Sequence, residues 1–400
     1  MKVFSLQAEL NIGLLGHVDH GKTSLTKALT GKWTDTHSEE VKRGISIRLG
    51  YADANISYCK KCDQYTTSDK CPKCGGKPEF RRRVSFLDAP GHETLMTTVI
   101  SASSIMDGAL LLISANEDCP QPQTIEHLTV LNITGIRNIV VVQTKVDLVP
   151  KEKAKEHYLK IKEFLRGSVA ENAPIIPVVA NQGINIGEIA RAIEETMPTP
   201  ARDDSKPPLL YVSRSFDINK PGTEVEKLKG GVIGGSLLHG KFRVGDEIEI
   251  LPGIEKEGKP PRPVRTKIAS LMCDGGPLQE ARPGGLIAIG TELDPAIAKG
   301  DFLVGCAVGK PGNLPAITTS AEMSYSPLER TDFENPPLKT GEPVVFSAQT
   351  STTIGVVANF KKGMLSLKLK KPVCIDKGST VAISRRVGQR WRLCGWGKTH

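Results

Sequence analysis

Residues Gly16 to Thr23 read GHVDHGKT, and this stretch decides the fold of the first half of the chain. It fits the pattern G-x-x-x-x-G-K-[ST]. The apolar run Leu10–Leu15 before it predicts a strand, and Lys22–Thr30 after it predicts a helix. A glycine-rich turn between a strand and a helix surrounds a phosphate with backbone N–H groups. The stretch therefore predicts a phosphate-binding loop, against the alternative of a structural glycine turn.

A second element supports this prediction. Phe86 to His92 read FLDAPGH, at the end of another expected strand. In a phosphate loop the lysine neutralises β/γ oxygens and the Thr23 hydroxyl binds Mg²⁺. Asp88 is placed to hold that ion through water, and the Gly91 N–H to sense a γ-phosphate. The predicted phosphate-binding residues are Asp19, His20, Gly21, Lys22, Thr23, Ser24 and Gly91.

Strands and helices alternate from residue 10 to about residue 200, which favours a doubly wound, mostly parallel sheet. The other expected strands are Val84–Leu87, Ala109–Ser114, Asn138–Gln143 and Ile175–Val179. The other expected helices are Glu93–Ser104, Gln123–Thr134, Glu152–Leu165 and Ile186–Met197.

A linker rich in proline and charge, between Met197 and Leu209, ends this pattern. Short β-branched runs divided by glycine and proline follow it, which predicts two β-barrels. We expect three domains: a nucleotide-binding domain at 1–205, a first barrel at 206–318 and a second at 319–400. The sequence marks the boundary between the two barrels less sharply than the linker before the first barrel.

Composition is that of an ordinary globular protein, with 39% hydrophobic and 24% charged residues. No apolar run approaches the ~20 residues of a membrane span. The first residues lack the basic-then-apolar pattern of a signal peptide, so we expect a cytoplasmic protein without membrane contact.

Basic residues exceed acidic ones by nine, 53 against 44. The segment 361–392 alone holds ten lysines and arginines and one acid, Asp376. This predicts a localised surface for a polyanion such as RNA. The alternative is a solvated strand face whose charges prevent aggregation.

Four cysteines form two paired hooks, C-x₂-C-x₈-C-x₂-C, between two expected strands. Two such hooks present four thiolates to one tetrahedral Zn²⁺. We predict a structural zinc knuckle at residues 59–74, held by Cys59, Cys62, Cys71 and Cys74. Redox pairs or inert cysteines are the alternatives, and nearby lysines are weak candidates for RNA contact.

The chain resembles the translational GTPases through GHVDHGKT, DAPGH and PQPQT-x-EH at Pro120 to His127. Within them it is similar to the gamma subunit of archaeal and eukaryotic translation initiation factor 2. That narrower resemblance rests on four further blocks: Trp33 to Asp53, CPQPQT at Cys119 to Thr124, Arg214 to Leu237, and Ile383 to Gly397.

The resemblance implies a GTP hydrolase that delivers initiator methionyl-tRNA to the small ribosomal subunit, in a trimer with alpha and beta subunits. It implies that Ser46 joins Thr23 on Mg²⁺, and that Asp19 and the Gly44 carbonyl hold a second cation. An Asp19 that only caps the loop is the alternative. His92 matches the histidine that positions the attacking water. No arginine finger is identifiable, so we expect a trans-acting activator.

Residues Gln143 to Asp147 read QTKVD, close to the N-K-x-D clasp that binds guanine, with Thr144 where asparagine is expected. Asp147 is expected to accept from guanine N1–H and the 2-amino group, while Lys145 lies along the base. By resemblance, the loop of Val179, Ala180 and Asn181 offers the Ala180 N–H to guanine O6, with Val179 replacing a serine. An asparagine at this position normally donates to the base and ties the pocket to the phosphate loop, and we expect Thr144 to keep only part of that role.

Two other functions fit parts of this pattern. An elongation-type or selenocysteine-specific aminoacyl-tRNA carrier shares the architecture and the phosphate chemistry. A zinc-bearing RNA-binding scaffold with a vestigial nucleotide fold belongs to a different class, and such a scaffold would show no Mg²⁺-dependent affinity for GDP.

Overall fold

The computed structural model describes residues 7–34, 49–92, 96–256, 259–330 and 333–400. The chain divides into two compact units, Met1–Ala201 and Arg202–His400. Among the described residues, no helix is long and apolar enough to cross a membrane.

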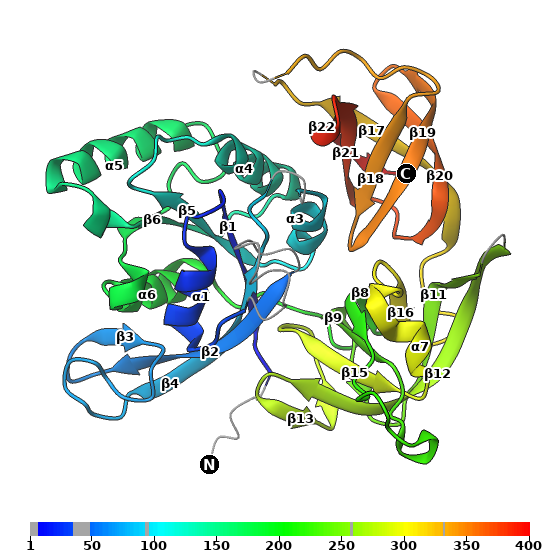
Figure 1. Cartoon of the computed structure of the whole chain (residues 1–400), viewed down its shortest axis with the longest axis horizontal. Helices are drawn as coiled ribbons and strands as arrows, with labels where there is room; N and C mark the ends of the chain where they lie inside the picture. The colour runs from blue at the N-terminus through cyan, green and yellow to red at the C-terminus, as the bar shows by residue number, and fades with distance from the viewer. Residues whose placement is uncertain (1–6, 35–48, 93–95, 257–258, 331–332) are drawn as a thin grey trace. The chain divides into compact units, whose positions relative to one another are not determined.

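In its described part, the first unit is built on a seven-stranded sheet with the order β3-β2-β4-β1-β5-β6-β7 (Figure 1). β4, β1, β5, β6 and β7 run parallel, while β2 and β3 are antiparallel additions at one edge. The strands are β1 Leu10–Gly16, β2 Gly50–Cys59, β3 Gln64–Thr66, β4 Glu79–Asp88, β5 Gly108–Ser114, β6 Ile139–Thr144 and β7 Ile175–Pro177.

Helices cover both faces of this sheet, with α1 and α6 on one face and α3, α4 and α5 on the other (Figure 1). Their bounds are α1 Lys22–Thr30, α3 Met96–Ser103, α4 Pro122–Thr134, α5 Lys151–Leu165 and α6 Ile186–Thr196. Short 3₁₀ turns lie at η2 Val146–Leu148 and η3 Ala180–Gln182. The central strands β1, β5 and β6 are buried along their whole length, as expected for parallel strands covered on both faces.

The second unit begins with a barrel in which the pairing of β11 with β12 closes a ring β11-β16-β8-β9-β15-β12. Its ring strands are β8 Leu209–Phe216, β9 Val232–His239, β11 Glu247–Lys256, β12 Lys259–Cys273, β15 Ile287–Thr291 and β16 Ala307–Gly309. Smaller elements are β10 Phe242–Arg243, β13 Gly276–Leu278, β14 Glu280–Ala281, α7 Pro295–Ala298, η4 Val225–Lys227 and η5 Lys299–Asp301.

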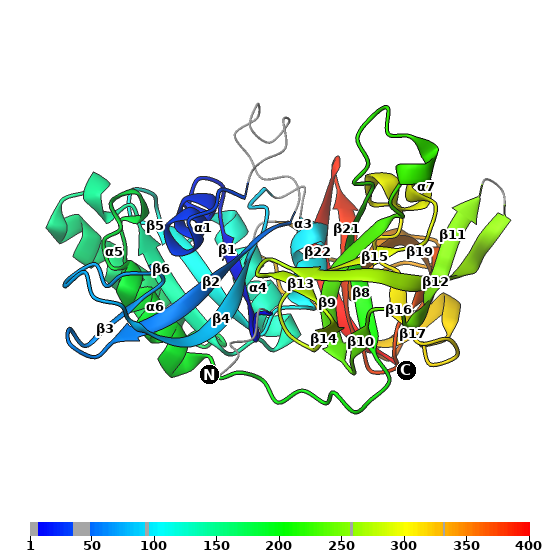
Figure 2. The same cartoon turned by 90° about the horizontal axis from the view of Figure 1, so that it is seen from below.

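The second barrel is a closed ring β17-β20-β19-β18-β21-β22, and Figure 2 shows its strands β17, β19, β21 and β22 from below. Its strands are β17 Ile317–Pro327, β18 Pro343–Ala348, β19 Ser351–Lys361, β20 Met364–Cys374, β21 Thr380–Val387 and β22 Arg390–Thr399. Along β20, Leu365, Leu367 and Leu369 are buried while Lys368 and Lys370 are exposed. This alternation is the period of a strand with one face in a core, so the lysines are displayed by the pleat itself.

The basic segment 361–392 is not uniformly a surface, because Arg385 is buried. Its guanidinium donates to Glu342 Oε1 at 2.6 and 3.1 Å and to the Pro336 carbonyl. Arg385 therefore fastens the loop before β18 to β21. Arg385 is therefore not part of the expected surface for a polyanion. Of the other basic residues in the segment, Lys368, Lys370, Arg386 and Arg390 are exposed.

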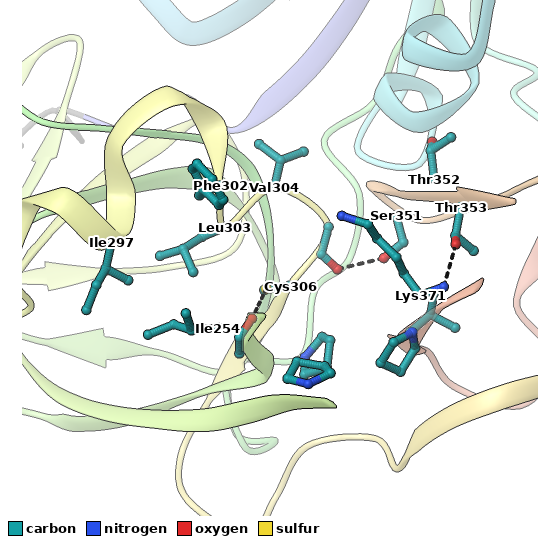
Figure 3. Close-up of a pocket in the computed structure, with 16 residues that line it drawn as sticks. Ile254, Ile297, Phe302, Leu303, Val304, Cys306, Ser351, Thr352, Thr353 and Lys371 are labelled. Carbon is teal, nitrogen blue, oxygen red and sulfur yellow. Dashed lines mark hydrogen bonds between the residues drawn. The ribbon is translucent and has the colours of Figure 1, made fainter. Parts of the chain in front are cut away.

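The two barrels meet at a small buried cluster and a pocket within the second unit. The cluster includes Tyr211 and Cys374, and the Ser351 hydroxyl donates to the Gly305 carbonyl at 2.6 Å. A pocket of about 290 Å³ lies beside this contact (Figure 3). Its apolar wall includes Phe302, and Lys371 lies on the other side. The hydroxyl bond and the buried cluster join the barrels.

The α/β fold with two following barrels is thus as predicted from the sequence. The observed helices begin and end within a few residues of the expected ones. The expected start of the helix Glu93–Ser104 lies outside the described residues, which resume at Met96. The expected strand Ile175–Val179 is shorter, ending at Pro177, because the chain turns there into η3.

Candidate functional site

The predicted nucleotide residues lie at one edge of the sheet of the first unit. Gly16 ends β1, Asp88 ends β4 and Thr144 ends β6, and all three strands are parallel. In open parallel sheets a ligand binds beyond the carboxyl ends of the strands, where such loops meet. The topology therefore brings together segments that are up to 128 residues apart.

Lys22 lies inside the phosphate loop, only 6% exposed. Its ammonium group donates to the Gly16 carbonyl at 3.0 Å and to the His17 carbonyl at 2.7 Å. Gly21 precedes α1 with φ 84°, a backbone conformation that glycine adopts without strain. The cation is therefore held at the mouth of the loop, at the N-terminal end of α1, where the helix dipole also favours an anion.

Asp88 is fully buried and accepts two hydroxyl hydrogen bonds through Oδ2. One comes from Thr23 at 2.8 Å, and the other from Thr34 at 2.6 Å. Two hydroxyls and a carboxylate are hard oxygen ligands of the kind that Mg²⁺ prefers. The sequence did not predict the contact of Thr34, because 54 residues separate it from Asp88 and no local pattern links the two.

Some expected cation ligands cannot be placed. Ser46 and the Gly44 carbonyl lie outside the described residues. Asp19 is exposed in the phosphate loop with φ 61°, in the left-handed region. Ser24 is half-buried in the first turn of α1. Their roles remain predictions.

His20 is turned away from the space inside the loop. Its Nδ1 bonds the Leu112 carbonyl at 2.8 Å, and its Nε2 lies 3.3 Å from Glu117. Burial lowers the pKa of this imidazole from 6.5 to about 3, so it is neutral. A phosphate contact from His20 is therefore confined to its backbone N–H. The side chain instead fastens the loop to β5.

His127 is a second histidine that supports the loop, and its position explains the histidine of the PQPQT-x-EH motif. The Gly16 N–H donates to His127 Nδ1 at 2.6 Å across 111 residues of sequence. The ring is fully buried, and burial lowers its pKa well below the usual value. The neutral ring carries its proton on Nε2, because Nδ1 accepts.

Gly91 packs directly on the phosphate loop. A Cβ added there would lie 2.4 Å from Lys22 Nζ and 2.9 Å from the Gly16 carbonyl oxygen. Such distances exclude any side chain larger than hydrogen, so the glycine of DAPGH is a steric requirement. His92 follows it, half-buried, before the gap in the described chain. Its role in positioning water remains a prediction.

Thr144 ties the expected base-binding clasp to the phosphate loop. Its hydroxyl donates to the His20 carbonyl at 2.8 Å, and the residue is only 2% exposed. A threonine hydroxyl has one proton, and this bond uses it. Thr144 therefore makes the tie to the phosphate loop that was expected of asparagine, and has no second proton to donate to a base.

The other residues of the expected base-binding clasp lie in the loops that follow β6 and β7. Lys145 has φ 56° and introduces η2, while the Asp147 carboxylate is exposed. Val179 is buried and pairs with Ile184, which closes a loop around η3. Ala180 is half-buried and packs on the core, and Asn181 is exposed. These residues follow β6 and β7, at the same edge as the phosphate loop.

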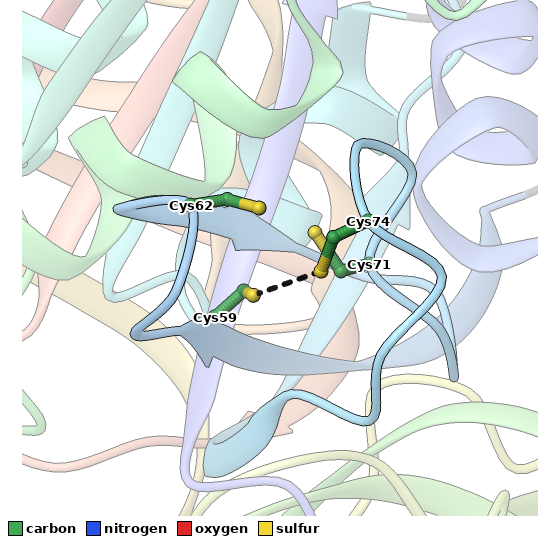
Figure 4. Close-up of side chains that lie close together, drawn as sticks. All are labelled: Cys59, Cys62, Cys71 and Cys74. Carbon is green, nitrogen blue, oxygen red and sulfur yellow. Dashed lines mark hydrogen bonds between the residues drawn. The ribbon is translucent and has the colours of Figure 1, made fainter.

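The four predicted zinc ligands form one cluster at the tip of the β2–β4 hairpin (Figure 4). Their sulfur atoms all lie within 4.8 Å of one another, and those of Cys59 and Cys74 are 3.7 Å apart. Tetrahedral zinc with Zn–S bonds of about 2.3 Å requires sulfurs about 3.8 Å apart. The geometry fits a tetrahedral thiophilic metal ion such as zinc.

Backbone N–H groups favour the thiolate form of one of the four cysteines, Cys71. The N–H groups of Cys74 and Lys73 lower the pKa of the Cys71 thiol to about 6. The neighbouring Cys74 thiol and burial raise the pKa of Cys62 to about 12. Crowded thiolates repel one another, and a bound cation removes this repulsion, so the four sulfurs are suited to share a metal.

The fold and the site define a class. Residues 7–199 match the Elongation factor Tu GTP binding domain, and residues 230–304 match Elongation factor Tu domain 2. Residues 319–399 match the family described as Initiation factor eIF2 gamma, C terminal. The chain is a GTP-hydrolysing translational GTPase.

Full-length relatives give the family. The chain is 55% identical over 399 residues to translation initiation factor 2 subunit gamma of Pyrococcus horikoshii, covering 98% of this chain and 97% of that protein. It is equally similar to the protein of that name from Methanocaldococcus jannaschii, with the same coverage. The chain belongs to the translation initiation factor 2 subunit gamma family, as its motifs predicted.

Solved structures agree on the fold. A bacterial selenocysteine-specific elongation factor superimposes with a TM-score of 0.75 at 25% identity, over 98% of this chain and 58% of that one. Translation elongation factor SelB of Methanococcus maripaludis, with a bound GTP analogue, gives 0.73 at 23% identity, over 98% of this chain and 78% of that one.

Proposed function

We propose that this GTPase binds initiator methionyl-tRNA and delivers it to the small ribosomal subunit, in a trimer with alpha and beta subunits. Hydrolysis of GTP accompanies start-site selection. The family membership over the whole chain carries this proposal. The described edge of the sheet supports it, because the phosphate loop, Asp88, Gly91 and the base-binding clasp lie together there.

In this proposal the phosphate loop binds GTP with little movement of its backbone. Lys22 is held by two carbonyls, and its ammonium turns to the β/γ oxygens when phosphate arrives. The Gly91 N–H adjoins the same space and responds to the γ-phosphate. His92 orients the attacking water. Transfer to water needs no covalent intermediate, so these residues act by position and charge.

Mg²⁺ would be held by Thr23 and Ser46, with Asp88 acting through water, and would neutralise charge on the phosphate oxygens. Thr34 joins this group, since its hydroxyl already bonds Asp88 at 2.6 Å. The Asp19 and Gly44 site for a second cation is a weaker proposal. Zn²⁺ at the four cysteines would be structural, because four thiolates leave no open ligand position.

Guanine would be read at the other end of the site. Asp147 accepts from N1–H and the 2-amino group, a pair of donors that adenine lacks. Lys145 flanks the base, and the Ala180 N–H meets O6. Thr144 contributes by holding the phosphate loop, and Asn181 and Val179 shape the loop around Ala180.

We further propose domain limits of 1–205, 206–318 and 319–400. The two barrels support this division, and β17 of the second barrel begins at Ile317, two residues before the proposed limit. The exposed lysines of β20 are our candidate for RNA contact. Binding to that surface should weaken steeply with salt, because each neutralised phosphate releases counterions.

Filter binding with the purified protein and its partner subunits tests the function. We expect GTP-dependent retention of initiator methionyl-tRNA over elongator methionyl-tRNA. A preference for elongator aminoacyl-tRNA would overturn the proposal in favour of an elongation-type carrier. An absence of Mg²⁺-dependent GDP binding would instead favour a scaffold with a vestigial nucleotide fold.

A further inference from the structure

The zinc knuckle touches the helix that follows the guanine loop. β3, Gln64–Thr66, lies between the two cysteine hooks and packs against α6 (Figure 1). At Gly187, in the first turn of α6, an added Cβ would lie 2.6 Å from the Tyr65 carbonyl oxygen and 3.3 Å from Nε2 of the Gln64 side chain. The backbone of the knuckle and the first turn of α6 are therefore in direct contact.

Arg191 makes a second connection one turn further along α6. Its Nη2 donates to the Asp63 carbonyl at 2.6 Å, and its guanidinium lies over the Tyr65 ring at 5.5 Å. Asp63 directly follows the ligand Cys62, and its carboxylate accepts from the Tyr58 hydroxyl at 2.7 Å. A metal that fixes Cys62 thereby fixes the carbonyl to which Arg191 binds.

The first turn of α6 is in turn continuous with the guanine loop. Val179 and Ile184 exchange two backbone hydrogen bonds, at 3.1 and 3.3 Å. Asn185, the residue before α6, donates through Nδ2 to the Pro177 carbonyl at 2.8 Å. Because the loop closes on the helix start, a shift of α6 moves Ala180.

We propose that Tyr65 and Arg191 are positioning residues that couple the four-cysteine site to guanine recognition. The knuckle braces the first two turns of α6, and α6 holds the Ala180 N–H at the height of guanine O6. The inference rests on the proposed guanine site. Metal binding at the knuckle would then raise the affinity for the nucleotide. Nucleotide binding would raise the affinity for the metal by the same factor, because coupling between two binding sites is reciprocal.

Two variants separate the knuckle from α6. Gly187→Ala places a methyl group against the Tyr65 carbonyl, and Arg191→Lys removes the planar donor while keeping the charge. Gly234→Ala is the matched control for the first, since its Cβ would make only ordinary contacts at 3.7 Å or more. Arg166→Lys is the control for the second, because Arg166 is exposed directly after α5 and its guanidinium pairs with Glu163 of that helix.

The readout is the ratio of two affinities in the full-length, zinc-loaded protein with Mg²⁺. GDP carries O6, whereas 6-thioguanosine diphosphate replaces this oxygen with sulfur, a much weaker acceptor, and keeps the N1–H and 2-amino donors that Asp147 would bind. We expect both variants to weaken GDP about fivefold, the value of one neutral hydrogen bond, and to weaken the analogue less than about twofold. A simple loss of stability lowers both affinities equally and leaves the ratio unchanged, and that result would overturn the inference.

Removal of zinc with a zinc-selective chelator, in excess Mg²⁺, gives an independent measurement. We expect the dissociation constant for GDP to rise by the same factor by which GDP lowers the dissociation constant for zinc. Equal GDP binding with and without zinc refutes the coupling. If the wild-type protein does not bind GDP at all, the guanine site itself is wrong, and the two failures are distinguishable. Should Gly187→Ala not fold, Arg191→Lys decides the outcome.

Discussion

Thr144→Val is the change that most directly tests how the base-binding clasp is held to the phosphate loop. The two side chains have nearly the same shape, but valine lacks the hydroxyl that donates to the His20 carbonyl at 2.8 Å. Position 144 is 2% exposed, so water does not replace the lost donor. The substitution leaves a buried carbonyl without its partner and keeps the packing of β6.

The expected losses of stability and of GDP affinity follow from the loss of that one hydrogen bond. A neutral hydrogen bond contributes about 1 kcal/mol, and an unsatisfied buried acceptor raises the cost to about 1–3 kcal/mol. For a unit of this size, 1 kcal/mol lowers the unfolding midpoint by about 2–4 °C. We expect GDP to bind about fivefold to tenfold more weakly, since each 1.4 kcal/mol is about a factor of ten. Preference for GDP over ADP should persist, because Asp147 is unchanged.

Equilibrium titration with a fluorescent GDP analogue, competed with GDP and ADP, measures both quantities. Thr134→Val is the matched control, because the Thr134 hydroxyl donates to the Val130 carbonyl at 2.8 Å within α4 and is not a predicted nucleotide residue. Its GDP affinity should stay within about twofold of the wild type. If Thr144→Val also stays within that range, the hydroxyl does not anchor the loop and the reasoning fails.

Four further changes test other parts of the site. Thr144→Asn should tighten GDP binding about fivefold, since a second N–H donor becomes available for the base; weaker binding would reveal another role for threonine. Lys22→Ala should abolish nucleotide binding in the same titration, and unchanged affinity would refute the phosphate-loop assignment. Cys62→Ser should lower bound zinc measured by elemental analysis, whereas Cys119→Ser, outside the cluster, should retain it. The His20 pKa of about 3 lies below its ordinary 6.5, so stability is full above pH 6.5 and falls with pH below it. His20→Gln should therefore flatten the pH dependence of unfolding between pH 6 and 4 by about 1.4 kcal/mol per pH unit, and an unchanged slope would contradict the buried neutral imidazole.

Local patterns in the sequence were enough to predict the elements and the chemistry at each of them. The phosphate loop needs only a strand, a short glycine turn and a helix in succession, and all three are readable within residues 10–30. The zinc hooks are similar, because each places two cysteines within one turn. The alternation of strands and helices also predicted the parallel sheet, since the connections that such a sheet requires are helices.

Contacts between distant segments were decided only by the tertiary structure. Thr34 reaches Asp88 across 54 residues, and Gly16 reaches His127 across 111. The sequence places Arg385 in a basic surface segment, but in the folded second barrel it is buried and forms an ion pair with Glu342.

The physical reason is that a side chain's role depends on which groups surround it after folding. Hydrophobic periodicity reports the face that a residue occupies, but not the partner that it meets there. The sequence by itself determined the class of site and the segments that carry it. Folding decided that the Thr144 hydroxyl donates its single proton to the phosphate loop, and that the cysteine knuckle packs against α6.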